Sequence, residues 1–473
     1  MRIIVFGTGK YYEKRKLELA KLIQCDEIVC FLDNKFDEES EIDGIPAVNP
    51  NQLKNIEFDI ILIMSIFYSE IYNQLCDIGV KSENIFTWKQ YRSIKLGGRI
   101  EKWLAKSQGK GENVLIVAQP IRYDGGSMAA VYAGMALRSR GYCVWMISEY
   151  VEKELREIIL REGINLALYQ DFPYFGENIK QWINMFSVII VNVFPNIHCA
   201  CELSAFKPVI WWIHENDKYC EIYRNTFKLF PHYQKNIKVN TVNILAVSER
   251  AMMNFHKYYP DIDVNIMPYG LPDFFSNHQY RKKKMVFAII GTISYLKGQD
   301  IFINAVKQLG DNEFRLAEFW IIGSTLGEYA SKLYRDASNI DIIKFKGELS
   351  RKEIEQVFSQ IDVVVSASRE DALPIVVTEG MMNEKVCIIP NVIGTVKYIN
   401  DMNNGIVFRS QDAGDLASKI TWCINNRDRL IEMGMEARKT YIKEFSMAKF
   451  VDRLESEILC AKYKFKAENN SML

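Results

Sequence analysis

Short apolar runs alternate with longer stretches of mixed polarity along most of the chain. Runs such as 60–67 and 188–194 are almost entirely apolar, which is typical of strands buried on both faces of a parallel sheet. Between such runs apolar residues recur three and four positions apart, as from Phe302 to Leu309, and this spacing predicts helices with one buried face. The pattern therefore predicts an α/β protein with helices on both faces of parallel sheets.

The runs fall into three successive α/β units. A smaller Rossmann-like unit is expected at 1–95, and the lysine- and glycine-rich stretch 96–112 has the composition of a linker. Two doubly wound Rossmann-like domains in tandem are expected at 113–280 and 281–445. The charged stretch 446–473 is predicted to be a helix that packs back toward the domain at 113–280.

The first unit contains part of a dinucleotide-binding pattern. Gly7 and Gly9 follow its first strand, and Asp33 ends its second strand. Tyr12 stands where phosphate approach and close helix packing need a residue without a side chain. We therefore favour a packing or partner-docking module over a nucleotide site, with the nucleotide question left open.

Length and charge limit the function classes. A chain of 473 residues is too long for one ordinary core and predicts about three domains. Lysine plus arginine equals aspartate plus glutamate, at 59 each, so no overall field attracts nucleic acid. The basic run 281–284 is a local exception, interpreted as a solvated interdomain linker rather than a membrane or polyanion patch.

Cysteine usage and the start of the chain predict a cytoplasmic location. The ten cysteines have no paired C-x-x-C spacing, which favours reduced thiols. Met1 and Arg2 lead directly into a predicted strand without a signal peptide, and no apolar run approaches the roughly 20 residues of a membrane helix. Peripheral contact with the inner face of the cell membrane, a protein partner and homo-oligomers stay open.

A metal site is not predicted. His198, Cys199 and Cys201 lie close together in the sequence. No second pair of ligands follows them at a recognisable spacing, and zinc sites normally need one.

The stretch 362–382 carries the clearest chemical signal. An apolar strand leads through a short acidic loop into a helix that Pro374 opens, and helix N-termini attract phosphate. Asp371 and Glu379 lie on either side of this turn, and carboxylates beside a phosphate site are suited to accept hydrogen bonds from neutral hydroxyls. A nucleotide-sugar has both a diphosphate and hydroxyl-rich rings. The alternative is a strand-to-helix turn without a ligand.

Three further loops add candidate groups at strand ends. Lys297 follows a predicted strand and can neutralise a diphosphate leaving group, with a solvated surface lysine as the alternative. His214 leaves another strand where a side chain can reach a polar ligand, unless it is structural. Gly125 and Gly126 allow close approach of backbone to a ligand, before a helix expected from about Met128.

These motifs together resemble the GT-B glycosyltransferases of family 4, which retain the anomeric configuration. The resemblance covers about 112–445 and rests on the glycine pair, the histidine after the tryptophan-rich strand, GTISYLKGQD, FKGELSRKEIEQVF and SASREDALPIVVTEGMM. It implies that Glu379 holds the donor ribose and Asp371 the transferred sugar. It also implies that Lys297 holds the diphosphate and His214 the sugar near the reacting carbon. The predicted donor-binding residues are Gly125, Gly126, Thr292, Lys297, Glu370, Asp371, Leu373, Pro374, Ile375 and Glu379; the predicted catalytic residues are His214, Lys297 and Asp371.

Two features depart from the family pattern. Many members carry an arginine where this chain has 293–296, so Lys297 acts alone or borrows another cation. Glu370 precedes Asp371, and a shift of one residue would exchange their roles. For mechanism, the resemblance implies front-side attack in which the leaving phosphate helps take the acceptor proton. This agrees with the absence of a recognisable nucleophile motif in the sequence.

The sequence thus predicts a hexosyltransferase that moves sugar from a nucleoside diphosphate donor, UDP by default, to a glycan or lipid-linked acceptor. It would work without a metal or cofactor in polysaccharide or glycoconjugate assembly. One rival is a catalytically silent GT-B scaffold subunit, which the four intact site residues disfavour. Another is an oxidoreductase or epimerase using the first unit, which Tyr12 disfavours.

Overall fold

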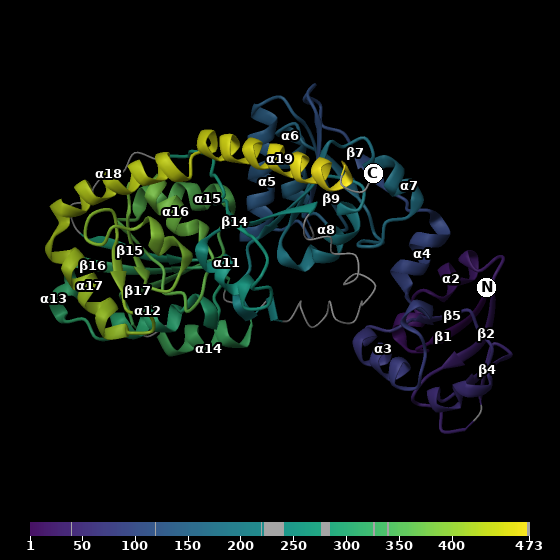
Figure 1. Ribbon diagram of the computed structural model, residues 1–473. Coiled ribbons are helices and arrows are strands. Elements are labelled where there is room, and N and C mark those ends of the chain that lie inside the picture. Colours follow the sequence, from purple (N-terminus) through teal and green to yellow (C-terminus); the bar gives the residue numbers. More distant parts are fainter. Residues whose placement is uncertain are drawn as a thin grey trace.

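The computed structural model describes residues 1–38, 40–118, 120–218, 220–221, 241–275, 284–324, 327–337 and 340–470. They form three units in series, with the N-terminal domain at one end and the C-terminal lobe at the other (Figure 1). The predicted α/β class and the order of its three sheets are confirmed. Most of the basic run, at 281–283, and the predicted boundary at 280 lie outside the described residues.

The N-terminal domain holds a six-stranded sheet in the order β3-β4-β2-β1-β5-β6, in which only the β3–β4 pair is antiparallel. Its elements are β1 (Arg2–Phe6), α1 (Lys10–Glu13), α2 (Lys16–Leu22), β2 (Glu27–Leu32), β3 (Ser40–Ile42), β4 (Ile45–Val48), β5 (Ile60–Ile63), α3 (Tyr68–Asp77), β6 (Ile85–Thr87) and α4 (Trp88–Leu96). The successive apolar residues of β1 and β5 are buried on both faces, as the pattern predicts.

Polar groups of the glycine turn form hydrogen bonds within this domain. The backbone N–H and the hydroxyl of Thr8 both donate to Asp33 Oδ2, at 2.9 and 2.7 Å. Tyr12 is buried with its ring at the edge of Phe31, and their ring centroids lie 5.4 Å apart. The carboxylate that a ribose would need is thus engaged, an arrangement that favours the packing-module interpretation.

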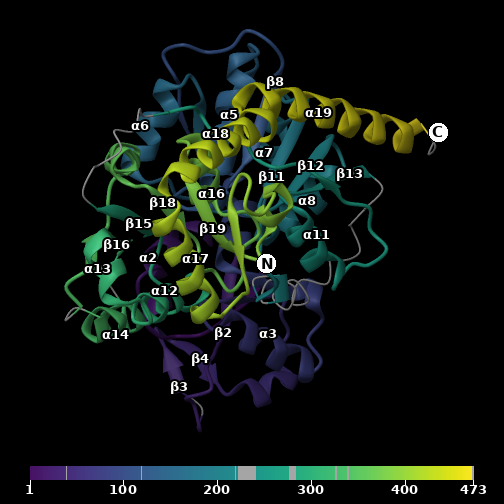
Figure 2. The ribbon, with the colours of Figure 1, turned by 90° about the vertical axis from the view of Figure 1, so that its left-hand side faces the viewer.

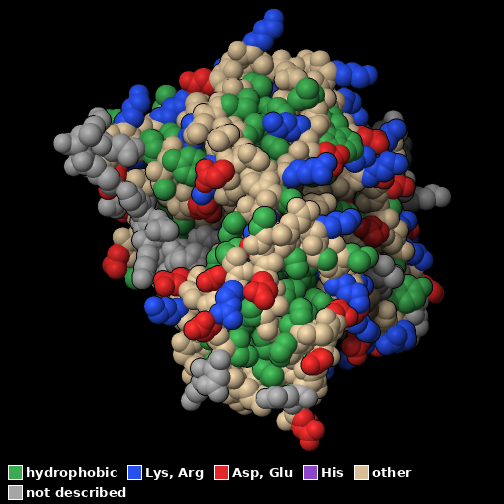
Figure 3. All heavy atoms as spheres, turned by 90° about the vertical axis from the view of Figure 1, so that its right-hand side faces the viewer, with side chains coloured by type: hydrophobic (Ala, Val, Ile, Leu, Met, Phe, Trp, Pro, Cys, Tyr) green, Lys and Arg blue, Asp and Glu red, His purple; other side chains and the backbone are tan. Residues whose placement is uncertain are grey.

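Helix α4 fastens this domain to the middle lobe. The Arg92 guanidinium lies 3.1 Å from the buried carboxylate of Asp171. The hydroxyl of Ser93 donates to the carbonyl of Tyr174 at 2.8 Å. On the face drawn in Figure 3, basic side chains are interspersed with acidic side chains and apolar patches.

The middle lobe is built on an eight-stranded sheet in the order β14-β13-β12-β11-β8-β9-β10-β7. Its elements are β7 (Glu101–Trp103), β8 (Asn113–Val117), α5 (Gly125–Ser139), β9 (Cys143–Ser148), α6 (Lys153–Arg161), β10 (Asn165–Leu168), α7 (Glu177–Ile183), β11 (Val188–Asn192), α8 (Ile197–Ser204), β12 (Val209–Ile213), β13 (Val242–Ala246), α11 (Glu249–His256) and β14 (Asn265–Ile266). The stretch 96–112 is more than a linker, because β7 pairs antiparallel with β10 at the sheet edge. Lysine and glycine content did not reveal this strand, which gains its order from the neighbouring strand.

The C-terminal lobe has a six-stranded parallel sheet in the order β17-β16-β15-β18-β19-β20. Its elements are β15 (Met285–Ile290), α12 (Gln299–Val306), α13 (Asp311–Leu316), β16 (Ala317–Ile322), α14 (Glu328–Ala337), β17 (Ile343–Gly347), α15 (Arg351–Val357), β18 (Val363–Val365), α16 (Ile375–Met382), β19 (Val386–Pro390), β20 (Ile406–Phe408) and α17 (Ala413–Asn425). In both lobes the strand order reverses near the centre, between β8 and β11 and between β15 and β18. Ligands bind at such reversals, beyond the carboxyl ends of the strands.

Two long helices join the lobes. Helix α18 (Arg427–Glu444) lies on the C-terminal lobe, and α19 (Met447–Asn470) crosses over to pack on α5, β12 and β13 (Figure 2). Phe450 of α19 is fully buried, with its ring centroid 5.6 Å from that of Trp212. A Cβ on Gly270 would come within 2.4 Å of Phe450, so the chain passes close beneath this ring. No helix in the described part of the chain has both the length and the apolarity to cross a bilayer.

Replacing Phe450 with alanine should loosen the crossing helix. Truncating a buried phenylalanine costs about 3–5 kcal/mol because packing is lost and a cavity remains. We expect Phe450→Ala to lower the midpoint of thermal unfolding by several degrees in calorimetry. Leu459→Ala on the same helix is the matched control, because Leu459 is 67% exposed. Equal midpoints for the two variants would contradict this packing role.

Candidate functional site

A cleft of about 620 Å³ lies between the carboxyl ends of the two large sheets. Both lobes contribute to its walls, and its size suits a nucleotide-sugar or another small ligand. Ten of the eleven predicted site residues line it, namely Gly125, Gly126, His214, Thr292, Lys297, Asp371, Leu373, Pro374, Ile375 and Glu379. Glu370 is the predicted residue that is not among the lining residues.

The loop after β15 projects Lys297 into the cleft. Gly298 follows it with a φ of +69°, and a Cβ there would lie 2.0 Å from the carbonyl oxygen of Ala367. Glycine is therefore required for this loop to lie against the loop after β18. The Lys297 Nζ atom reaches Asp371 Oδ2 at 2.5 Å, and the lysine side chain remains 40% exposed.

Three consecutive charged residues after β18 point to three different partners. Arg369 forms a bidentate ion pair with Asp300, at 2.9 and 2.6 Å, and so fixes the loop that carries Lys297. Glu370 turns to the middle lobe, and Asp371 turns into the cleft toward Lys297. The segment 369–371 therefore contacts the loop that carries Lys297 and also contacts the middle lobe.

The adjacent acids Glu370 and Asp371 occupy different environments. Glu370 Oε1 accepts hydrogen bonds from the backbone N–H of Asp217 at 2.7 Å and from the Asn254 side chain at 3.1 Å. Asp371 lines the cleft and lies opposite Lys297. Of the two acids, Asp371 is the one placed to meet a ligand in the cleft.

A second ion pair faces the cleft at Glu379, which lies in α16 and is almost fully buried. Its carboxylate pairs with Arg351 at the start of α15. The guanidinium also lies over the ring of Phe274, 4.7 Å from its centroid. Glu379 raises the pKa of Arg351 further above its usual value, although burial opposes this.

Arg351 was not singled out from the sequence. A signal was present, because Ser350 and Glu353 form a capping box that opens α15 and places Arg351 at its first position. The sequence also predicted Pro374 as the first helical residue, whereas α16 begins at Ile375 and Pro374 is the extended residue before it. The difference is one residue, within the ordinary spread of helix boundaries.

His214 follows β12 and presents its ring to the cleft. The ring packs on Trp212, with centroids 4.4 Å apart. Its Nε2 atom is buried and has no hydrogen-bond partner among the described residues. Burial lowers the pKa of His214 to about 3, so the ring is neutral near pH 7. The neighbouring Glu215 accepts the N–H groups of Phe194 and His214, at 2.8 and 2.9 Å, which fixes this loop.

Gly125 and Gly126, at the start of α5, lack a side chain for different structural reasons. A Cβ on Gly126 would lie 2.8 Å from Val193 Cγ1, so this glycine serves packing within the lobe. Gly125 faces the cleft, where the nearest atom to a Cβ is Ile375 Cδ1 of the opposite lobe, at 4.0 Å. Helix α5 begins at Gly125 rather than near Met128, because the Asp124 side chain caps it by accepting the N–H of Ser127.

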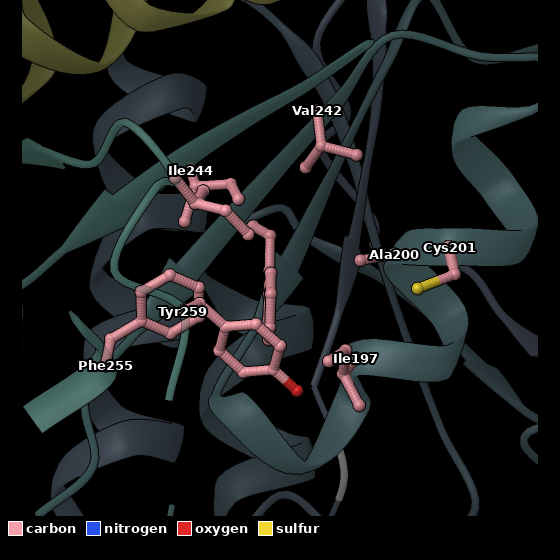
Figure 4. A pocket seen from close by; sticks show the side chains of 9 residues that line it. Ile197, Ala200, Cys201, Val242, Ile244, Phe255 and Tyr259 are labelled. Carbon is pink, nitrogen blue, oxygen red and sulfur yellow. The ribbon is translucent and has the colours of Figure 1, made fainter. Parts of the chain in front are cut away.

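The described residues contain no group of three or more His, Cys, Asp or Glu side chains that could hold a metal ion. Cys201 instead lines a small apolar cavity with Ile197 from α8 and with Phe255 and Tyr259 (Figure 4). This cavity measures about 10 Å³, the space of roughly one water molecule. It is too small for a nucleotide.

Comparison with known families assigns the C-terminal lobe. Residues 272–440 match the family model for glycosyl transferases group 1, and residues 1–86 match the C2185-like N-terminal model. The C-terminal lobe is thus a glycosyl transferases group 1 domain. The family match includes Lys297, Arg351, Asp371 and Glu379.

Two relatives match this chain over about two thirds of its length. An uncharacterized glycosyltransferase of Methanocaldococcus jannaschii is 29% identical over 322 residues, which are 64% of this chain and 85% of the relative. The poly(ribitol-phosphate) alpha-N-acetylglucosaminyltransferase of Staphylococcus aureus is 22% identical over 318 residues, 66% of this chain and 57% of that enzyme.

Solved structures of other proteins superpose on this chain. Anabaena HepE in complex with UDP-glucose superposes with a TM-score of 0.62 at 14% identity, covering 74% of this chain and 100% of that one. A glycosyltransferase from Rickettsia africae gives a TM-score of 0.62 at 20% identity, covering 74% and 99%. At these identities the likeness shows that this chain shares their fold.

The buried ring of His214 should stay neutral well below its ordinary pKa. We expect its NMR resonances, assigned with the His214→Gln variant, to show no protonation down to about pH 5. A lowered pKa means that the ring's contribution to stability is complete above 6.5 and is lost as the pH falls toward 3. A titration midpoint near 6.5 would contradict the buried placement.

Proposed function

We propose that the chain is a retaining glycosyltransferase of family 4 that moves a hexose-type sugar from a UDP-sugar to a glycan or lipid-linked acceptor. The proposal includes turnover without a metal ion and a role in polysaccharide or glycoconjugate assembly. One observation carries it: two acid–cation pairs, Lys297–Asp371 and Arg351–Glu379, line one interlobe cleft in a group 1 glycosyltransferase chain.

The cations suit the diphosphate. Among the described residues that line the cleft, Lys297 and Arg351 are the lysine and the arginine, and they supply its positive charge. Lys297 is the more exposed of the two and is held by a single carboxylate, so an entering diphosphate can draw its ammonium group away from Asp371. The lysine then stabilises negative charge on the departing UDP, which lowers the barrier to cleavage of the sugar–phosphate bond.

The acids suit the hydroxyls of the donor. Once Lys297 turns to the diphosphate, Asp371 is available to accept hydrogen bonds from the transferred sugar. Glu379 lies deeper and keeps its ion pair with Arg351, which maintains the carboxylate as an acceptor for the ribose hydroxyls. In this proposal the ribose lies at Glu379, the diphosphate at the cations and the sugar at Asp371.

The middle lobe would supply the group nearest the reacting carbon. His214 is neutral and presents a buried Nε2 atom without a described partner, which is suited to a hydrogen bond with the sugar. The acceptor hydroxyl would attack on the face that UDP leaves, and a phosphate oxygen would help take its proton. Closure of the cleft would exclude water and protect the donor from hydrolysis.

A thermal-shift panel of nucleotide-sugars is the first test of this proposal. Ligands that bind the folded protein raise its unfolding midpoint in proportion to the logarithm of saturation. We expect UDP-sugars to stabilise the chain more than sugars linked to other nucleotides. If no nucleotide-sugar shifts the midpoint at millimolar concentration, the proposal is wrong.

Removing the charge of Glu379 should weaken donor binding. We expect Glu379→Gln to lower the affinity for the best UDP-sugar roughly 10- to 100-fold in calorimetry, because a hydrogen bond to a charged group contributes about 1.5–3 kcal/mol. Glu355→Gln is a matched control, since Glu355 also pairs with Arg351, at 3.3 Å, but is not a lining residue. Equal affinities in all three proteins would refute the ribose role.

Lys297 should matter for turnover more than for folding. We expect Lys297→Ala to reduce the rate of UDP release from the donor about 10²- to 10³-fold, the usual cost of losing one group that stabilises developing charge. Its unfolding midpoint should stay close to that of the wild type, because the side chain is 40% exposed. Lys344→Ala, on β17 of the same lobe, serves as the control. A large fall in the midpoint would mark Lys297 as structural instead.

A further inference from the structure

Glu370 joins two loops that come from opposite lobes. Its Oε1 atom accepts the backbone N–H of Asp217 at 2.7 Å and the side-chain N–H of Asn254 at 3.1 Å. Asp217 lies three residues after His214, where a helical segment begins beyond β12, and Glu370 directly precedes Asp371. One carboxylate oxygen thus connects the backbone beside His214 to the backbone beside Asp371.

The residues after Asp371 make further contacts with the middle lobe. The hydroxyl of Ser248 donates to the carbonyl of Ala372 at 2.6 Å, and the hydroxyl of Tyr269 donates to the carbonyl of Leu373 at 3.1 Å. These two bonds reach backbone oxygens only. Among these contacts, those of Glu370 are made by a side chain of the loop after β18, and a substitution there can remove them.

The middle-lobe side of the contact is braced. The carboxylate of Asp217 pairs with Lys257 and accepts the hydroxyl of Tyr258 at 3.2 Å. Asn254 lies on α11, which begins with a Ser248 cap. Because Asp217 and Asn254 are held in this way, their hydrogen bonds to Glu370 can fix the position of the loop after β18 relative to the middle lobe.

Burial makes the contact costly to lose. The Glu370 side chain is 15% exposed, and the Arg250 guanidinium lies 3.9 Å from its carboxylate. Hydrogen bonds to an ionised carboxylate are shorter and stronger than neutral ones. Without the carboxylate, the N–H groups of Asp217 and Asn254 would lose this partner at the lobe interface.

We propose that Glu370 is a positioning residue that couples closure of the two lobes to the placement of Asp371. Its contact with Asp217 and Asn254 sets the spacing between Asp371 and His214, so the two groups meet the transferred sugar together only when this contact is formed. This inference rests on the proposed function, in which both residues hold that sugar. The UDP part of the donor depends on Lys297 and Glu379 of the C-terminal lobe and is independent of the contact.

The test separates nucleotide binding from handling of the sugar. Calorimetry with UDP and with the best UDP-sugar of the panel, and the rate of UDP release, would be measured for the wild type, Glu370→Gln and Glu370→Ala. We expect the affinity for UDP to stay within about twofold in all three proteins. We expect UDP release to fall at least about tenfold in Glu370→Ala and less in Glu370→Gln, whose amide oxygen still accepts hydrogen bonds.

A double-mutant cycle with Asn254→Ala tests the contact itself. If Glu370 acts through this partner, the two alanine substitutions should be non-additive in their effect on UDP release. Additive effects, or a loss of UDP affinity that matches the loss of rate, would overturn the inference. If Glu370→Ala does not fold, the same comparison of UDP affinity with rate is made for Glu370→Gln and Asn254→Ala.

The outcome also distinguishes this inference from the proposed function. If the wild type binds and cleaves a UDP-sugar while Glu370→Ala does so at the normal rate, only the positioning role fails. If the wild type binds no nucleotide-sugar, the proposed function fails with it.

Discussion

The structure of the site depends on how three neighbouring charges after β18 are divided. Arg369 is committed to Asp300, Glu370 to the middle lobe, and Asp371 to Lys297. Charged side chains next to one another in sequence repel or attract strongly unless each has its own partner. Here each has one. Arg369 pairs with Asp300 at the start of α12, Glu370 accepts from Asp217 and Asn254 of the middle lobe, and Asp371 pairs with Lys297 in the cleft. The segment 369–371 therefore helps to fix the loop that carries Lys297 and the segment that follows His214.

The larger architecture supports this arrangement from outside. Both large sheets reverse their strand order near the centre, and the loops after β8, β15 and β18 open at these reversals. Helix α19 leaves the C-terminal lobe and packs on the middle lobe. The two lobes are therefore joined by this helix as well as by the contacts of Glu370. The N-terminal domain is fastened through α4 at the far side of the middle lobe, and none of its described residues lines the cleft.

Much of this could be predicted from the sequence because strand ends in parallel sheets converge. Apolar runs located the strands, and the polar residues that follow them, including Lys297, His214, Asp371 and Glu379, reach one cleft. The partners of side chains were harder to predict. Arg351 is far from Glu379 in sequence, and Glu370 and Asp371 differ only in the direction that tertiary contacts give them. The edge strand β7 depends on pairing with β10, which the composition of 96–112 does not encode.

A crystal structure with a bound UDP-sugar tests the central claim most directly. The account predicts that Lys297 Nζ leaves Asp371 and lies about 3 Å from a diphosphate oxygen, while Asp371 accepts a hydroxyl of the sugar. It also predicts ribose hydroxyls at Glu379. A nucleotide bound outside this cleft, or a Lys297–Asp371 pair unchanged beside a bound diphosphate, would contradict the account.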